Sequence, residues 1–192
     1  MIIAIRHGPV AADGLCYGRW NPPLRNRPDA DARIVLNRLG KLSATQHLAV
    51  ESATDGFVRI VTSPADRCRQ LAACLAEQLN LGLHDEPRIA ELSMGEWEGQ
   101  LWTQLEQHDG ERLRLWMEHW QTAAPPEGES LADLEARVRA AYDASASGGP
   151  TLWVTHAGVI RALRVLLHST PWTAAMESPV PHLTPELLVG GR

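Results

Sequence analysis

Three short apolar runs, separated by helical patterns, constrain the fold of this chain more than any other feature. The runs cover residues 1–6 (MIIAIR), 57–62 (FVRIVT) and 151–155 (TLWVT). They are rich in β-branched residues, which favours buried strands. Helical periodicity is found over 29–53 with a break near Gly40, from Ser63 to about Asn80, over 102–120, over 131–146 and after Gly158. This alternation predicts an α/β fold with a mainly parallel sheet.

Local signals refine the expected elements. The helix after the second run has a start signal, with Ser63 expected at the N-cap, Pro64 at the first helical position and Asp66 in the first turn. Residues 81–100 show no clear period and are expected to be irregular. The tail from Pro171 is rich in proline, which predicts an extended or looped segment.

Composition and charge exclude several classes of protein. The 192 residues suit one domain, since domains commonly hold roughly 100–200 residues. The net charge of −5 argues against an extended nucleic-acid-binding surface. No stretch approaches the ~18 apolar residues of a membrane span, and Arg6 and His7 interrupt the apolar start where a signal peptide would continue. The 3 cysteines form no CxxC pair, so we expect a cytoplasmic protein without a disulfide framework.

Basic side chains follow the predicted strands at the point where each strand ends. Arg6 and His7 close the first strand, and Arg67 lies one helical turn beyond the second. His156 follows the third strand directly. Parallel strands place their carboxyl ends at one sheet edge, where ligands bind in such folds. Each residue alone also suits a solvated, capping or ion-paired role, but together they predict a site for a small anion.

Five segments, in order, resemble the signature of the histidine phosphatase superfamily, which includes the cofactor-dependent phosphoglycerate mutases. They are Arg6-His7-Gly8, Ser63-Pro64-Ala65-Asp66-Arg67, Glu91-Leu92-Ser93-Met94-Gly95-Glu96-Trp97-Glu98-Gly99, Pro126-Glu127-Gly128-Glu129-Ser130 and Thr155-His156-Ala157-Gly158. The resemblance spans residues 1–168 and implies a three-layer α/β/α sandwich of the phosphoglycerate mutase type. It also implies a single domain over 1–192, with residues 92–130 as a helical segment over the site.

The resemblance implies a phosphohistidine mechanism. His7 would be the nucleophile, and its other ring nitrogen must then donate to a fixed acceptor. Arg6, Arg67 and a protonated His156 would hold the phosphoryl oxygens. Glu91 would protonate the leaving oxygen and then activate water. Glu96 and Glu98 compete for that role, although the later glutamate of this segment is more often structural.

The run from residue 17 resembles the α-ribazole phosphatases within the superfamily. Tyr17, Gly18 and Arg19 match their pattern and are therefore expected to bind substrate. Asn21 stands where that pattern has an aspartate, and Pro9-Val10 replaces an acidic or amide residue followed by Ser or Thr. The superfamily's Leu-Thr-x-x-Gly-x-x-Gln helix start is not clear near residues 39–46.

These features predict a metal-independent phosphatase that acts on a small phosphate monoester, with α-ribazole phosphate as the suggested substrate. No metal or other cofactor is expected, because arginines carry the counter-charge and no metal-ligand, P-loop or GxSxG motif is found. The alternatives are a phosphoglycerate mutase and a non-catalytic phospho-ligand binder. Trp116 and Trp120 fit either a core-facing pair or a surface that stacks on the substrate, and Trp20 is a further candidate for stacking.

Overall fold

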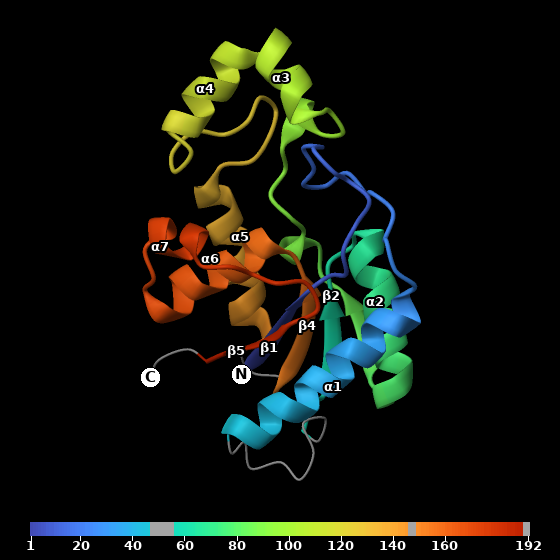
Figure 1. Ribbon diagram of the computed structural model, residues 1–192. Helices are drawn as coiled ribbons and strands as arrows, with labels where there is room; N and C mark the ends of the chain where they lie inside the picture. The colour runs from blue at the N-terminus through green and yellow to red at the C-terminus, as the bar shows by residue number, and fades with distance from the viewer. Residues whose placement is uncertain (47–55, 146–148, 190–192) are drawn as a thin grey trace.

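The computed structural model describes residues 1–46, 56–145 and 149–189 (Figure 1). Its strands are β1 (Ile2–Arg6), β2 (Arg59–Thr62), β3 (Gly82–Asp85), β4 (Thr151–Thr155) and β5 (Pro185–Leu188). They form one sheet in the order β3-β2-β4-β1-β5. All neighbouring pairs are parallel except β1 with β5, which is antiparallel. The expected α/β class with a mainly parallel sheet is therefore confirmed.

Helices cover both faces of this sheet, as the three-layer architecture requires. They are α1 (Pro28–Gln46) and α2 (Asp66–Leu79) on one face, and α5 (Leu131–Ser145) and α6 (Ala157–His168) on the other (Figure 1). Successive residues of β1 point to opposite faces, so Ile3 and Ile5 pack against α1 and α2. Ile2 and Ala4 pack against α5 and α6. Both cores therefore depend on the period-2 burial of the central strands.

Two short helices, α3 (Trp102–His108) and α4 (Gly110–Glu118), lie away from the sheet (Figure 1). The single helix expected over 102–120 is therefore divided, and Asp109 between the two parts accepts a hydrogen bond from Trp97 Nε1 at 2.7 Å. A third apolar cluster holds this region together and comprises Cys16, Met94, Trp97, Leu105 and Leu113. The Cys16 N–H also donates to the Gln100 carbonyl at 2.8 Å, which ties the loop after β1 to this region.

The structure corrects several local expectations. Strand β3 lies in the segment expected to be irregular, and all four of its residues are exposed, so it carries no apolar period. The proline-rich tail holds α7 (Trp172–Glu177) and β5, whose Pro185 is tolerated because this strand lies at the sheet edge. Helix α1 continues through Gly40, which has open space around it, and residues 47–53 of the expected helix lie outside the described ranges. Residue 146, the expected end of the helix over 131–146, is also outside them.

The predicted N-cap of α2 is wrong. The helix begins at Asp66 with Ala65 at the N-cap, and no side chain caps it. Ser63 lies before the helix, where its Oγ accepts from the Ala65 N–H at 3.3 Å and contacts a histidine described below. Among the described residues, none of the helices combines the length and apolar character that crossing a bilayer requires.

Candidate active site

The carboxyl ends of β1, β2 and β4 meet at one edge of the sheet. Arg6 pairs with Thr155 in the parallel register, and the His7 N–H donates to the Thr155 carbonyl at 3.0 Å. This register places His7 and His156, the residues after the two strands, side by side with ring centroids 5.2 Å apart. Arg67 reaches both rings from α2. We call this group the basic edge: Arg6, His7, Arg67 and His156.

His7 is held with one ring nitrogen directed at the basic edge. Its Nδ1 lies 2.7 Å from the Gly8 carbonyl oxygen, which can only accept, so Nδ1 carries the hydrogen. Nε2 is then the nitrogen with a lone pair, and it accepts from Arg67 Nε at 3.3 Å. A Cβ at position 8 would lie 2.0 Å from an Asp31 carboxylate oxygen, so glycine allows Asp31 to approach the backbone here. His7 thus has the fixed acceptor that a nucleophilic imidazole needs.

His156 takes the opposite tautomer. The guanidinium of Arg67 can only donate, so His156 Nδ1 accepts its N–H at 3.2 Å. Nε2 then donates to Ser63 Oγ at 2.7 Å. The thiol of Cys68 lies 3.5 Å from Nε2, and burial raises the pKa of that thiol well above its ordinary value, so it stays protonated.

Both histidines are neutral in this environment. Burial lowers the pKa of His7 well below its ordinary value, and the Arg67 charge lowers it further. Burial also lowers the pKa of His156, with His7 and Arg67 as the next causes. Burial and the neighbouring cations thus favour the neutral ring of His156 in the structure as it stands, whereas the predicted protonated ring concerns the phosphate-bound state. A phosphate dianion at this edge would oppose those effects and favour the charged ring.

Arg67 also organises the loop that follows β1. It is 1% exposed, and its NH1 donates to the Trp20 carbonyl at 2.8 Å and to Asn21 Oδ1 at 3.1 Å. Its NH2 donates to the Gly18 carbonyl. Asn21 thus supplies an acceptor where the related pattern has an aspartate, and it does so without neutralising the Arg67 charge. The guanidinium carbon lies 5.5 Å from the centre of the Tyr17 ring.

Arg6 reaches the edge from the other side. Its NH1 donates to the Val180 carbonyl at 2.9 Å, so the C-terminal segment holds the guanidinium. Its Nε is buried and has no hydrogen-bond partner within the described ranges. A buried donor without a partner is costly, and an anion at this edge would supply the missing acceptor.

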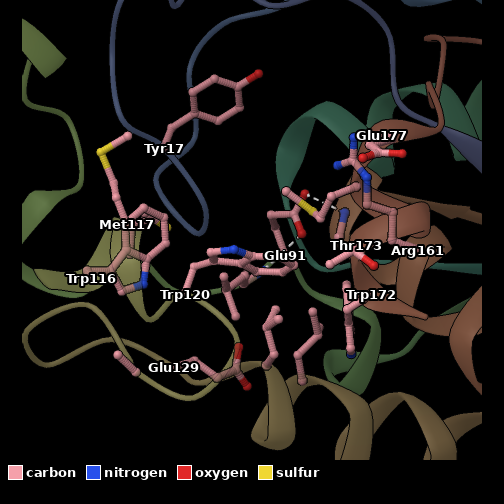
Figure 2. Close-up of a pocket in the computed structure, with 17 residues that line it drawn as sticks. Tyr17, Glu91, Trp116, Met117, Trp120, Glu129, Arg161, Trp172, Thr173 and Glu177 are labelled. Atoms are coloured by element: carbon pink, nitrogen blue, oxygen red, sulfur yellow. Dashed lines mark hydrogen bonds between the residues drawn. The ribbon is translucent and has the colours of Figure 1, made fainter. Parts of the chain in front are cut away.

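Glu91 lines a cavity of about 560 Å³ (Figure 2), and its carboxylate also reaches the backbone two residues after His156. Its carboxylate accepts from the backbone N–H groups of Leu92 at 3.0 Å and Gly158 at 3.2 Å, the latter in the first turn of α6. A Cβ at position 158 would lie 2.3 Å from the carboxylate, so glycine is required for this approach. Of the three candidate glutamates, Glu91 alone lines this cavity.

The competing glutamates have structural contacts. Glu98 accepts hydrogen bonds from backbone N–H groups of Gly18, Arg19, Trp20 and Met94, so it fixes the loop after β1. Glu96 forms an exposed ion pair with Arg112 at 3.0 Å. These contacts agree with the expectation that the later glutamate is structural.

Tryptophans supply much of the cavity wall, so we call it the Trp cavity. Its aromatic lining is Tyr17, Trp116, Trp120 and Trp172, and Met94, Met117 and Met176 add further apolar surface. Trp116 packs edge-on against Trp97 at 5.6 Å between ring centres. The aromatic lining comes from the loop after β1, from α4 and the turn that follows it, and from α7, and it surrounds Glu91 in Figure 2. Residues of α5 and α6, among them Leu134 and Arg161, complete the wall.

Two residues expected to contact substrate, Arg19 and Trp20, have side chains that lie away from the basic edge. The Arg19 side chain is half exposed and lies 3.6 Å from Glu129, a wall residue of the Trp cavity, rather than at the basic edge. Trp20 is 41% exposed and lies outside the cavity lining, close to Gly99. Gly18 contributes its backbone, since a Cβ there would lie 1.8 Å from the Leu92 carbonyl oxygen.

Sequence reasoning missed His182. Its Nδ1 lies 2.7 Å from the His7 carbonyl oxygen, and its ring centre lies 5.2 Å from that of His7. The residue sits in the proline-rich tail, 175 positions from its partner. The antiparallel return of β5 along β1 brings the two together, and no local pattern signals that pairing.

Comparisons with known proteins agree with this geometry. The sequence profile of the histidine phosphatase superfamily (branch 1) matches residues 2–184. The probable phosphoglycerate mutase GpmB of Yersinia enterocolitica is 27% identical over 174 residues, which cover 88% of this chain and 75% of that protein. The α-ribazole phosphatase structure from Shigella flexneri matches with a TM-score of 0.78 and 26% identity, over 95% of this chain and 86% of that one. A mycobacterial glucosyl-3-phosphoglycerate phosphatase shares the fold, with a TM-score of 0.74 and 23% identity over 94% and 85% of the two chains. The chain therefore belongs to branch 1 of the histidine phosphatase superfamily and is an enzyme of the phosphatase class.

Proposed function

We propose that this phosphatase hydrolyses small phosphate monoesters, without a metal ion, through a phosphohistidine on His7. The observation that carries the proposal is the state of His7. Its tautomer is set by Gly8, its Nε2 accepts from Arg67, and Arg67 also reaches His156, two residues before the Gly158 N–H that binds Glu91. A neutral imidazole with a directed lone pair, next to fixed positive charge, suits attack on phosphorus.

The first half of the reaction transfers the phosphoryl group to the enzyme. Nε2 of His7 attacks phosphorus, the bond to the ester oxygen breaks, and the carboxyl group of Glu91 gives its proton to that oxygen. The guanidinium groups of Arg6 and Arg67 and the ring of His156 hold the equatorial oxygens. Because Arg67 Nε donates to Nε2 in the structure, this donor must turn to a phosphoryl oxygen as the bond forms.

The second half returns the enzyme to its starting state. The Glu91 carboxylate takes a proton from water, and the water oxygen attacks phosphorus. The bond between Nε2 and phosphorus then breaks and inorganic phosphate leaves. A phosphoglycerate mutase would run the first half in the same way and return the phosphoryl group to a second hydroxyl.

Within this reaction we propose an ester with an aromatic leaving group, such as α-ribazole 5′-phosphate. The tryptophans of the Trp cavity lie directly beyond Glu91, where a leaving group would extend. Flat aromatic rings stack well on such walls. The similarity to the Shigella α-ribazole phosphatase favours the same substrate class. We also propose that residues 92–130 act as an insertion over the site within one domain spanning 1–192, because Trp116 and Trp120 come from this segment.

The test of the reaction is hydrolysis of p-nitrophenyl phosphate at mildly acidic pH with excess EDTA. Wild type is expected to be active, and His7→Ala is expected to be inactive. His84→Ala, at an exposed position of β3, is the matched control and keeps full activity. Rapid acid-free quenching and mass spectrometry should find one phosphoryl group on His7. Retained hydrolysis in His7→Ala, or loss of wild-type activity in EDTA, would contradict the proposal.

The test of the substrate is a panel at equal concentration. α-Ribazole 5′-phosphate should be hydrolysed with a higher kcat/KM than glycerol phosphate. Conversion of 3-phosphoglycerate that depends on a bisphosphoglycerate would instead assign the chain to the mutases.

A further inference from the structure

The C-terminal segment contacts the proposed nucleophile through one side chain. Because the His7 carbonyl can only accept, the 2.7 Å contact requires that Nδ1 of His182 carry the hydrogen and donate it. The His7 ring has two other imidazoles as neighbours, His156 and His182, each 5.2 Å away between ring centroids. We infer that His182 is a positioning residue that sets the orientation of His7, an inference that rests on the proposed role of His7.

The segment that carries His182 is itself firmly held. The Leu183 N–H donates to the Arg6 carbonyl at 2.9 Å, and Leu183 is buried with a φ of +60°. From the other side, Arg38 NH1 donates to the His182 carbonyl at 3.0 Å. A leucine in the left-handed region is unfavourable, so the surrounding contacts must compensate for it. This turn aims the His182 ring back at the end of β1.

The contact can act on the His7 ring through the backbone. The His7 carbonyl belongs to the peptide plane that joins His7 to Gly8. Tilting this plane would move Gly8, whose own carbonyl accepts the hydrogen of His7 Nδ1. His182 therefore fixes the peptide plane between His7 and Gly8, and this plane fixes the tautomer and the ring rotation of His7. Displacement of a reacting group by about 1 Å is enough to cost roughly 100-fold in rate.

Side-chain geometry provides a matched set of variants. The Nδ2 of asparagine occupies nearly the place of histidine Nδ1, so His182→Asn keeps the donor to the His7 carbonyl. The Nε2 of glutamine corresponds to the other ring nitrogen, so His182→Gln and His182→Ala lose that donor. We expect His182→Ala and His182→Gln to lower kcat on p-nitrophenyl phosphate by about 10- to 100-fold. His182→Asn should recover most of the wild-type kcat.

The inhibition constant of inorganic phosphate separates positioning from binding. A residue that only orients His7 leaves this constant unchanged in all three variants, while kcat falls in two of them. Equal kcat in His182→Asn and His182→Ala would overturn the inference, and so would a loss of phosphate affinity that parallels the loss of kcat.

A second readout does not depend on turnover. Nitrogen-15 NMR of the imidazole groups should show His7 as a single Nδ1–H tautomer in wild type and in His182→Asn. In His182→Ala the His7 signals should shift toward a mixture of tautomers. Unchanged His7 signals in His182→Ala would overturn the inference even where His7→Ala is inactive. If His7→Ala instead stays active, the proposed function fails, and the NMR comparison still decides the role of His182.

Discussion

The basic edge and the Trp cavity touch at Glu91 but are built in different ways. The edge takes His7 and His156 from the ends of two central parallel strands and Arg67 from a helix start, all of them almost completely buried. The aromatic walls of the cavity come from the loop after β1, the region of α4 and α7, whereas α5 and α6 line its other side with Leu131, Leu134, Gly158 and Arg161. Strand ends in a packed sheet hold reacting groups tightly, whereas loops and peripheral helices can vary without disturbing the core. The difference indicates that the reaction and the substrate preference are set by separate parts of the molecule.

The largest effect should appear where the two parts meet. Glu91→Gln keeps the shape of the carboxyl group but removes its transferable proton. We expect the rate of phosphoryl transfer to His7 to fall by roughly 100- to 10,000-fold with alkyl phosphates, and much less with p-nitrophenyl phosphate, whose leaving group needs no protonation. Single-turnover release of the alcohol or phenol from both esters checks this step apart from the later attack of water, with Glu96→Gln as the control. An equal loss in this first step with both esters would exclude Glu91 as the proton donor.

Arg67→Lys tests the edge alone. Lysine keeps the charge but cannot contact both histidines and hold the loop at Trp20 and Asn21 simultaneously. We expect kcat to fall by roughly 100- to 1,000-fold. Arg69→Lys, on the same helix and paired with Asp85 at the surface, should be close to wild type. If Arg67→Lys and Arg69→Lys have similar kcat values, the planar guanidinium of Arg67 is not required at the basic edge.

Trp120→Ala tests the cavity alone. We expect KM for an aromatic ester to rise by about 10-fold, because the lost stacking and burial amount to roughly 1–1.5 kcal/mol. Hydrolysis of glycerol phosphate should keep its kcat. Trp20→Ala, which lies outside the cavity, is the control. A similar loss of kcat/KM on both esters would show that Trp120 supports the basic edge rather than contacting the leaving group.

A further effect concerns stability and belongs to the basic edge. The pKa values of His7 and His156 are lowered in the folded state by burial and nearby positive charge. In the unfolded chain a histidine binds a proton below a pKa of about 6.5, whereas these two stay neutral to a lower pH in the folded protein. Their contribution to the free energy of unfolding is therefore fully present above that pKa and is lost as pH falls toward the pKa values of the folded state. The free energy of unfolding therefore falls as pH decreases within that window, because the unfolded state binds protons that the folded state excludes.

Urea unfolding at pH 7.5 and 5.5 checks this difference. Wild type should lose more stability between the two conditions than a His7→Asn, His156→Asn double variant. Trp120→Ala should keep the wild-type pH dependence. Identical pH dependence in wild type and the double variant would contradict the assignment of acid sensitivity to the edge.

Much of the fold could be predicted from the sequence, because the central strands have a strong local signal. Strands β1, β2 and β4 are buried on both faces and therefore appear as continuous apolar runs. The edge strands β3 and β5 lack that signal, because β3 has no buried residue and β5 begins at a proline. Helix α1 crosses Gly40 because Val35 and Leu39 pack into the core on its buried side, which outweighs the low helix propensity of glycine.

The candidate site shows the same division between features with a local sequence signal and features that depend on long-range contacts. The sequence by itself determined that His7, Arg67 and His156 follow strand ends. Because the three strands are parallel, these residues must then lie at the same edge of the sheet. The tertiary structure alone decided the tautomers of the two histidines, the neutral state of His156, the pairing of Arg19 with Glu129 and the contact of His182 with His7. These features depend on burial and on partners that are distant along the chain, whereas residue order reports mainly local propensity and period.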